Sequence, residues 1–227
     1  MNTVHHFFFG IYPYIAFAIF LLGCLVRYDR EQYTWKTGSS QLLESKQLKI
    51  GSRLFHIGVI MILIGHFVGL LTPHIVWDLL GVSAALKQKV AMGAGGLFGV
   101  ICFIGLTILI HRRLTNDRVK ASTSTMDLTI LFLLYAQLIL GLISIFVSMG
   151  HLDGSEMLKL MHWAQQLVIF NGHEAAGAII NVHWIFKLHI FLGMTLFVVF
   201  PFSRLVHVWS VPVRYLRRNY QVVRSKN

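Results

Sequence analysis

Charged residues are scarce in this sequence. They make up 13% of 227 residues, whereas hydrophobic residues reach 56%; soluble domains average about 25% and 45–50%. Mean hydropathy is correspondingly high, at +0.66. With only 4 prolines and no low-complexity tract, a disordered or linker-rich chain is also excluded. The composition therefore predicts an integral membrane protein.

Cysteine is nearly absent too. Cys24 and Cys102 both lie in apolar stretches, so no disulfide framework is expected, and without a C-x-x-C-H motif neither is covalently bound c-type haem. There is no cysteine cluster for an iron–sulfur centre. The first apolar run has neither a basic leader nor a small-residue cleavage site, and we expect it to be a retained membrane span.

A membrane crossing needs about 20 mostly apolar residues. Five runs satisfy this: residues 4–26, 54–75, 89–110, 126–149 and 182–210. We predict an all-α bundle of five transmembrane helices, formed by a single domain over 1–227 with a cytoplasmic tail at 211–227. Between the last two runs, apolar residues recur at helical spacing, which predicts an amphipathic helix on the membrane surface.

The basic residues indicate an orientation. Of the 20, six lie in segment 27–53, four in 111–125 and six from 204 onward. The positive-inside rule then places these segments in the cytoplasm and the N-terminus outside, which five crossings make consistent. The net charge of +11 is therefore explained by topology and anionic lipid headgroups, and no nucleic-acid partner is expected.

Eight of the 12 histidines fall at span ends or in loops, and four remain inside the spans: His56 and His66 in the second, His189 and His207 in the fifth. Ionisable residues in a membrane are costly and usually functional. Two neutral imidazoles facing each other from different helices are what bis-histidine haem ligation requires. Because these two helices run antiparallel, His56 pairs with His207 near the cytoplasm and His66 with His189 near the outside. Hydrogen-bonded packing or proton relay is the alternative for each.

The spacing along the two helices is unequal. On continuous helices, His56 and His66 lie about 15 Å apart along the axis and His189 and His207 about 27 Å. Each pair would then be offset by about 6 Å, which helix tilt or a kink at Pro201 could absorb.

Several motifs make the chain recognisable. They are F-F-F-G-I-Y-P-Y at 7–14, R-Y-D at 27–29, L-F-H-I-G at 54–58, L-T-P-H at 71–74, K-Q-K at 87–89, H-x-D-G-S-E-M at 151–157 and F-P-F-S-R-L-V-H-V-W-S-V-P-V at 200–213. Over nearly its whole length the chain resembles the gamma subunit (cytochrome b) of the membrane-bound bacterial respiratory nitrate reductase. The segments 76–86 and 171–183 match that family poorly.

The resemblance implies particular roles for these residues. His66 and His189 match the ligands of a distal haem b near the outer face, and His56 and His207 those of a proximal haem b near the cytoplasm. Lys87 matches a lysine of the quinol site, although a lysine at a helix end can also simply snorkel. Gly65 would allow close approach of the quinone ring, with helix packing as an equal alternative.

The resemblance also implies partners. In the bacterial inner membrane, menaquinol or ubiquinol would be oxidised near the outer face, and electrons would pass from the distal to the proximal haem. They would leave to an iron–sulfur beta subunit, bound with a molybdenum catalytic alpha subunit, because this chain has no site for the terminal acceptor. The basic first loop and the tail would dock that partner, unless their charges only fix topology. The tail residues concerned are Tyr215, Arg217, Arg218, Tyr220 and Arg224.

Two further interpretations remain open at this stage. The chain could be the cytochrome b subunit of a different quinol-linked reductase, such as one of sulfur metabolism. It could also be a haem-free membrane anchor or transporter with histidines as proton relays, although no inverted repeat supports transport.

Overall fold

The computed structural model describes residues 2–35, 40 and 43–210, and every regular element in these ranges is helical. In chain order the elements are α1 Thr3–His6, η1 Phe7–Ile11, α2 Tyr12–Arg30, η2 Gln32–Thr34, α3 Lys46–Leu71, α4 His74–Leu79, α5 Ala84–Thr115, α6 Asp117–Ala121, α7 Thr125–Ser148, α8 Ser155–Val168, α9 Gly172–Ala178, α10 Trp184–Val199, η3 Phe200–Phe202 and η4 Arg204–Ser210. Five helices are long and apolar enough to cross a membrane: Thr3–Arg30, Lys46–Leu71, Ala84–Thr115, Thr125–Ser148 and Trp184–Phe202. The predicted all-α bundle with five spans is confirmed.

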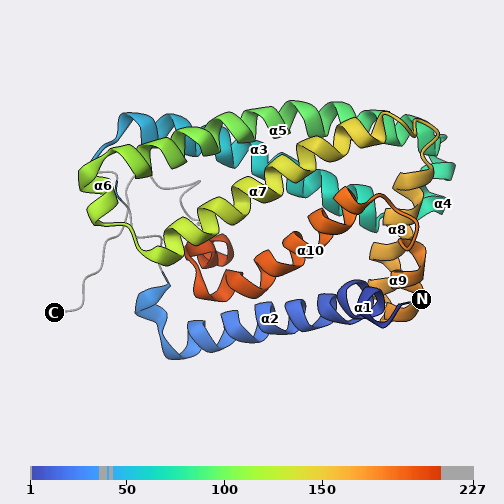
Figure 1. The fold of residues 1–227 in the computed structure, drawn as a ribbon, viewed down its shortest axis with the longest axis horizontal. Helices are drawn as coiled ribbons and strands as arrows, with labels where there is room; N and C mark the ends of the chain where they lie inside the picture. Colours follow the sequence, from blue (N-terminus) through green and yellow to red (C-terminus); the bar gives the residue numbers. More distant parts are fainter. Residues whose placement is uncertain (1, 36–39, 41–42, 211–227) are drawn as a thin grey trace.

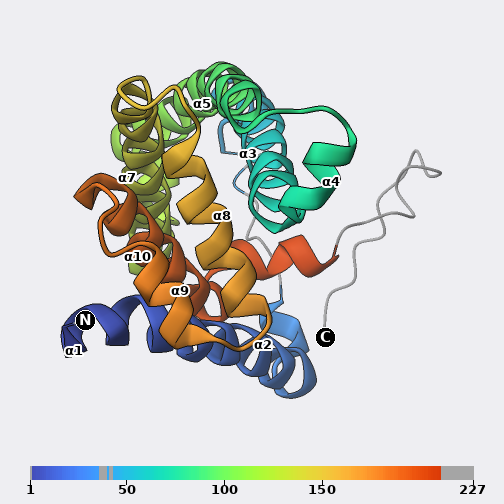
Figure 2. The same ribbon diagram turned by 90° about the vertical axis from the view of Figure 1, so that its right-hand side faces the viewer.

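The spanning helices form an arc. Helix α3 packs against α5, α5 against α7, α7 against α10 and α10 against α2, so that α3 and α2 stand at its two ends (Figure 2). Helices α8 and α9 cover the end of the bundle at which the N-terminus lies, and α6 lies at the opposite end (Figure 1). The arc leaves α3 and α10 facing each other, and these two helices carry His56, His66 and His189, three of the four histidines predicted as haem ligands.

The tightest contact in the arc depends on glycine. A Cβ atom on Gly105 of α5 would lie 2.4 Å from the Phe55 backbone nitrogen of α3, and one on Gly58 would lie 2.5 Å from the Cys102 Cβ. Small residues let membrane helices approach closely in this way. The glycines of segment 93–99 of α5 contribute less, because only Gly99 meets a close neighbour, Leu142 of α7.

Helix α8 occupies the predicted amphipathic segment, but its apolar face packs on protein rather than on the membrane surface. Met161, Trp163 and Leu167 are buried, and the Trp163 indole N–H donates a 3.0 Å hydrogen bond to the Phe9 carbonyl. Helix α9 and η1 complete this core, because the backbones of Gly10 and Gly172 meet there without intervening side chains.

The fifth apolar run, 182–210, does not form one helix. Helix α10 ends at Val199, one 3-10 turn follows, and the extended residue Ser203 (ψ 177°) separates it from η4. Pro201 causes the break, because it has no N–H to donate to the preceding turn and its ring clashes with a continuing helix. Element η4 consequently turns away from the bundle axis, appearing end-on in Figure 1 and side-on in Figure 2.

We predict that Gly105→Leu destabilises the protein by about 1–3 kcal/mol or prevents its accumulation, because the added side chain must separate α3 from α5. Thermal unfolding of the purified, detergent-solubilised protein measures the effect. Gly93→Ala is the matched control, since nothing lies within 4 Å of the Cβ position there. Equal melting temperatures for the two variants would contradict the proposed tight crossing.

Candidate functional site

The four histidines predicted as haem ligands form two facing pairs, although His207 lies beyond the fifth span, on η4. The ring centres of His66 and His189 are 6.1 Å apart, and those of His56 and His207 are 6.3 Å apart. A metal–imidazole nitrogen bond is about 2 Å and a ring nitrogen lies about 1 Å from its ring centre, so two imidazoles on opposite sides of one metal ion are about 6 Å apart. Both pairs have the separation that axial ligation of a single iron requires.

Three of these rings are oriented by hydrogen bonds to a backbone carbonyl three or four residues earlier in the chain. His56 Nδ1 lies 2.7 Å from the Ser52 carbonyl oxygen, His66 Nδ1 2.8 Å from that of Ile62, and His207 Nδ1 2.7 Å from that of Arg204. An Nδ1–H that donates to a carbonyl fixes the neutral tautomer and leaves the Nε2 lone pair free for a metal. This arrangement is what haem ligation needs from a histidine.

His189 is held differently. Its Nδ1 is buried without a hydrogen-bond partner among the described residues. On its other side, the Gln137 amide of α7 lies 3.3 Å from His189 Nε2 and donates to the His189 carbonyl oxygen at 3.1 Å. Gly141 makes room for the ring, since a Cβ atom there would lie 3.2 Å from His189 Cε1. An unpaired buried ring nitrogen is costly, and the site therefore fits a ligand that imidazole can coordinate.

Lys87 lies at the same end of the bundle as His66 and His189. It is buried, at 7% exposure, and its Nζ contacts the Met161 sulfur at 2.8 Å and lies 4.5 Å from the centre of the Trp77 ring. Within the described ranges no carboxylate pairs with it. A buried ammonium with such weak acceptors has hydrogen-bonding capacity left for a ligand oxygen.

Gly65, the other residue suggested for quinol, faces open space: no atom lies within 4 Å of its Cβ position. The packing alternative for Gly65 has no contact to support it. Trp77 and Met161 were not singled out from the sequence. Trp77 lies in the segment 76–86, and only its closeness in space to Lys87 reveals it.

Arg112, at the far end of α5, has a second role that the sequence did not reveal, because there it counted only as a charge that sets the membrane orientation. It is 2% exposed and donates to Glu44 Oε2 at 2.7 Å and to the Ser40 carbonyl oxygen at 2.9 Å. A hydrogen bond from the Gln47 backbone N–H lowers the pKa of the Glu44 carboxyl, and Arg112 lowers it further. Arg112 thereby ties the basic first loop to the bundle.

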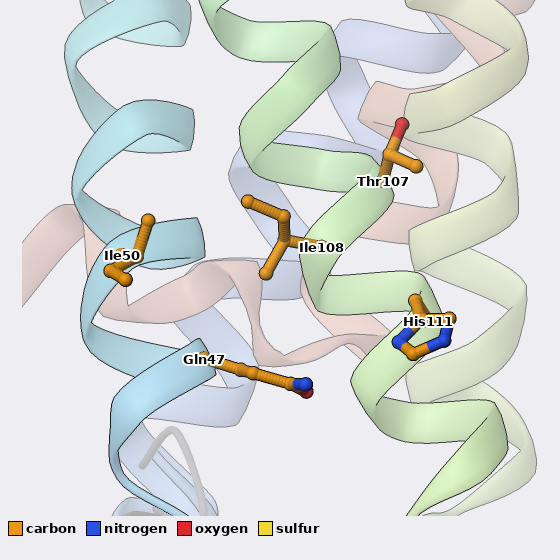
Figure 3. Close-up of a pocket in the computed structure, with 5 residues that line it drawn as sticks. All are labelled: Gln47, Ile50, Thr107, Ile108 and His111. Carbon is orange, nitrogen blue, oxygen red and sulfur yellow. The ribbon is translucent and has the colours of Figure 1, made fainter.

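A groove of about 340 Å³ lies between α3 and α5. Figure 3 shows the residues that line it, which are Gln47, Ile50, Thr107, Ile108 and His111. None of the four paired histidines lines it, nor does Lys87. Over the part of the chain that the structure describes, no group of three or more His, Cys, Asp or Glu residues could hold a metal ion. The paired histidines and the Lys87 environment therefore define the candidate site.

The family model for the nitrate reductase gamma subunit matches residues 5–226. The chain belongs to this family. It is 52% identical to the respiratory nitrate reductase 1 gamma chain of Escherichia coli (strain K12) over the full length of both chains. It is also 37% identical to the nitrate reductase gamma chain of Bacillus subtilis (strain 168) over 96% of this chain and 97% of the relative.

Family membership makes the chain a multi-pass membrane subunit of a nitrate reductase, an oxidoreductase complex with other subunits. This outcome confirms the resemblance inferred from the motifs. It favours nitrate reductase over the other quinol-linked reductases left open above. The roles of individual residues stay predictions.

Proposed function

We propose that this gamma subunit binds two b-type haems and oxidises quinol, menaquinol or ubiquinol, on behalf of the complex. His66 and His189 would hold one haem, and His56 and His207 the other. The observation that carries the proposal is the separation of the two facing pairs, 6.1 and 6.3 Å between ring centres. Hydrogen-bonded packing does not require two pairs at this one spacing.

The proposed orientation follows the basic residues. In the bacterial inner membrane, the N-terminus and helices α8 and α9 lie outside, and the first loop and α6 lie in the cytoplasm. His66, His189 and Lys87 then belong to the outer side, and His56 and His207 to the cytoplasmic side. The iron–sulfur beta subunit and the molybdenum alpha subunit dock from the cytoplasm.

The residues of this chain have separate tasks in this proposal. When bound, the haems supply one-electron carriers between quinol and the iron–sulfur subunit. Lys87 donates a hydrogen bond to a quinol oxygen, and Gly65 leaves room for the ring beside His66.

The first prediction concerns haem content. The purified complex should carry two b-type haems in this subunit, and His66→Leu and His207→Leu should each carry one, because each variant removes one of the two histidines that would hold one haem. Visible difference spectra with a haem count measure this. His111→Leu, which changes an unpaired histidine, should keep both. A wild-type subunit without haem would overturn the proposal.

The second prediction concerns quinol. Lys87→Ala should keep both haems but slow their reduction by quinol roughly 10- to 100-fold, since a hydrogen bond from a charged group contributes about 1.5–3 kcal/mol. Stopped-flow reduction of the haems by a quinol analogue gives the rate. Lys89→Ala removes the same charge two residues away at an exposed position and serves as the control. Equal slowing in both variants would show that Lys87 has no special role.

The third prediction concerns docking of the partner. The tail from 211 onward lies outside the described residues, so its role rests on its charge alone. Deleting residues from 214 onward should give a haem-loaded membrane protein that no longer co-purifies with the soluble subunits. Retained co-purification would assign those charges to topology and lipid contact.

A further inference from the structure

The break at Pro201 separates two proposed haem ligands, because His189 lies before it on α10 and His207 after it on η4. A 3-10 segment beyond a break has no continuous helical ladder to fix its direction. Something else must therefore hold η4 so that His207 faces His56. The contacts around the break identify helix α2 as the element that does this.

One face of α2 follows the break. Phe20, Gly23 and Arg27 recur at helical spacing on it. Phe20 contacts both sides of the break, with its ring centre 4.8 Å from that of Phe200 and 5.4 Å from that of Trp209. A Cβ atom on Gly23 would lie 2.8 Å from Pro201 Cγ. The glycine therefore lets α2 approach the proline closely.

Arg27 binds the exposed backbone of the break itself. Its Nη1 donates to the carbonyl oxygens of Pro201 at 2.5 Å and Ser203 at 2.8 Å. The other edge of the guanidinium donates to Thr34, through Nε to the side-chain oxygen at 3.2 Å and through Nη2 to the carbonyl oxygen at 2.8 Å. A planar guanidinium can make all four bonds at once, which a lysine ammonium cannot.

The opposite side of the break is held by an ion pair. Arg204, the first residue of η4, lies 3.6 Å from Asp127 of α7, and Arg113 of α5 lies 3.3 Å from the same carboxylate. The Arg204 carbonyl is also the acceptor for His207 Nδ1. A displacement of the break would therefore be transmitted directly to the His207 ring.

We propose that Arg27 is a positioning residue for His207: by binding the carbonyls of Pro201 and Ser203, it fixes η4 so that the imidazole meets His56 at haem-ligating distance. This inference rests on the proposed function, because it concerns the haem held by His56 and His207. A carbonyl oxygen that is left without a hydrogen-bond partner in a membrane raises the free energy of the folded protein. Loss of Arg27 therefore changes the backbone conformation of the break in addition to removing a positive charge.

The test uses the intact complex in membranes and three variants. Arg27→Gln removes the guanidinium, Arg27→Lys keeps the charge but not the fork, and Gly23→Ala pushes Pro201 without altering any charge. Arg30→Gln is the control, because Arg30 carries the same charge on the same helix at an exposed position. Low-temperature electron paramagnetic resonance and a redox titration report each haem separately. The signals are assigned by their loss in His207→Leu and His66→Leu.

We expect the signal that is lost in His207→Leu to shift or broaden in all three variants, with the signal lost in His66→Leu unchanged. Changing groups that orient a ligand weakens metal affinity by roughly 10- to 100-fold, so that haem should also be the first lost under limiting haem supply. Arg30→Gln should change neither signal.

Two results would overturn the inference alone: both signals unchanged in the Arg27 variants, or both altered equally, which would mean general destabilisation. Should Arg27→Gln fail to accumulate, Arg27→Lys and Gly23→Ala still decide the question. A wild-type complex without haem in this subunit is a different result, because it overturns the proposed function together with the inference.

Discussion

The hydrocarbon core of a membrane contains no water that can hydrogen-bond to unpaired peptide groups. This constraint accounts for the positions of several polar residues in the structure. Four spans satisfy their backbone internally as continuous helices. The fifth is interrupted at Pro201, and there an arginine from another helix binds the carbonyls of Pro201 and Ser203. Arg112 does the same for the carbonyls of Ser40 and Glu44 beside α5. Two arginines therefore complete the backbone hydrogen bonding of irregular segments.

The sequence was sufficient for what depends on composition and on distance along one helix. Runs of apolar residues predicted the five spans, and helical rise placed His56 and His66 about 15 Å apart. The sequence was not sufficient for features that depend on contacts between helices. The fifth helix was expected to continue through Pro201, and the resulting axial offset of about 6 Å between paired histidines followed from that assumption. Because the helix breaks at Pro201, this assumption does not hold, and His207 faces His56 from the separate element η4.

Packing partners were equally beyond the sequence. The periodicity of α8 predicted a helix with one apolar face, but periodicity does not say whether lipid or protein covers that face. Trp163 settles it by donating to the Phe9 carbonyl. Likewise, the pattern of residues did not identify Gly105 and Gly58 as the tight crossing, because which face of α5 meets α3 is fixed only in the folded bundle. The contact between Trp77 and Lys87 is also a tertiary contact, and the sequence pattern does not predict it.

The two histidine pairs differ in how they are built, and the difference has a consequence. His66 and His189 both lie on continuous helices, so their separation is set by helix packing and by small residues such as Gly141 behind the His189 ring. The separation of His56 and His207 depends instead on a joint held by hydrogen bonds and an ion pair to Asp127. Hydrogen bonds from one side chain are easier to break than a helix interface is to separate. His56 and His207 lie on the side at which the partner subunits are proposed to dock. Arg27 links the joint at Pro201 to Thr34 of the first loop. A partner that binds the first loop can therefore alter the geometry of this pair.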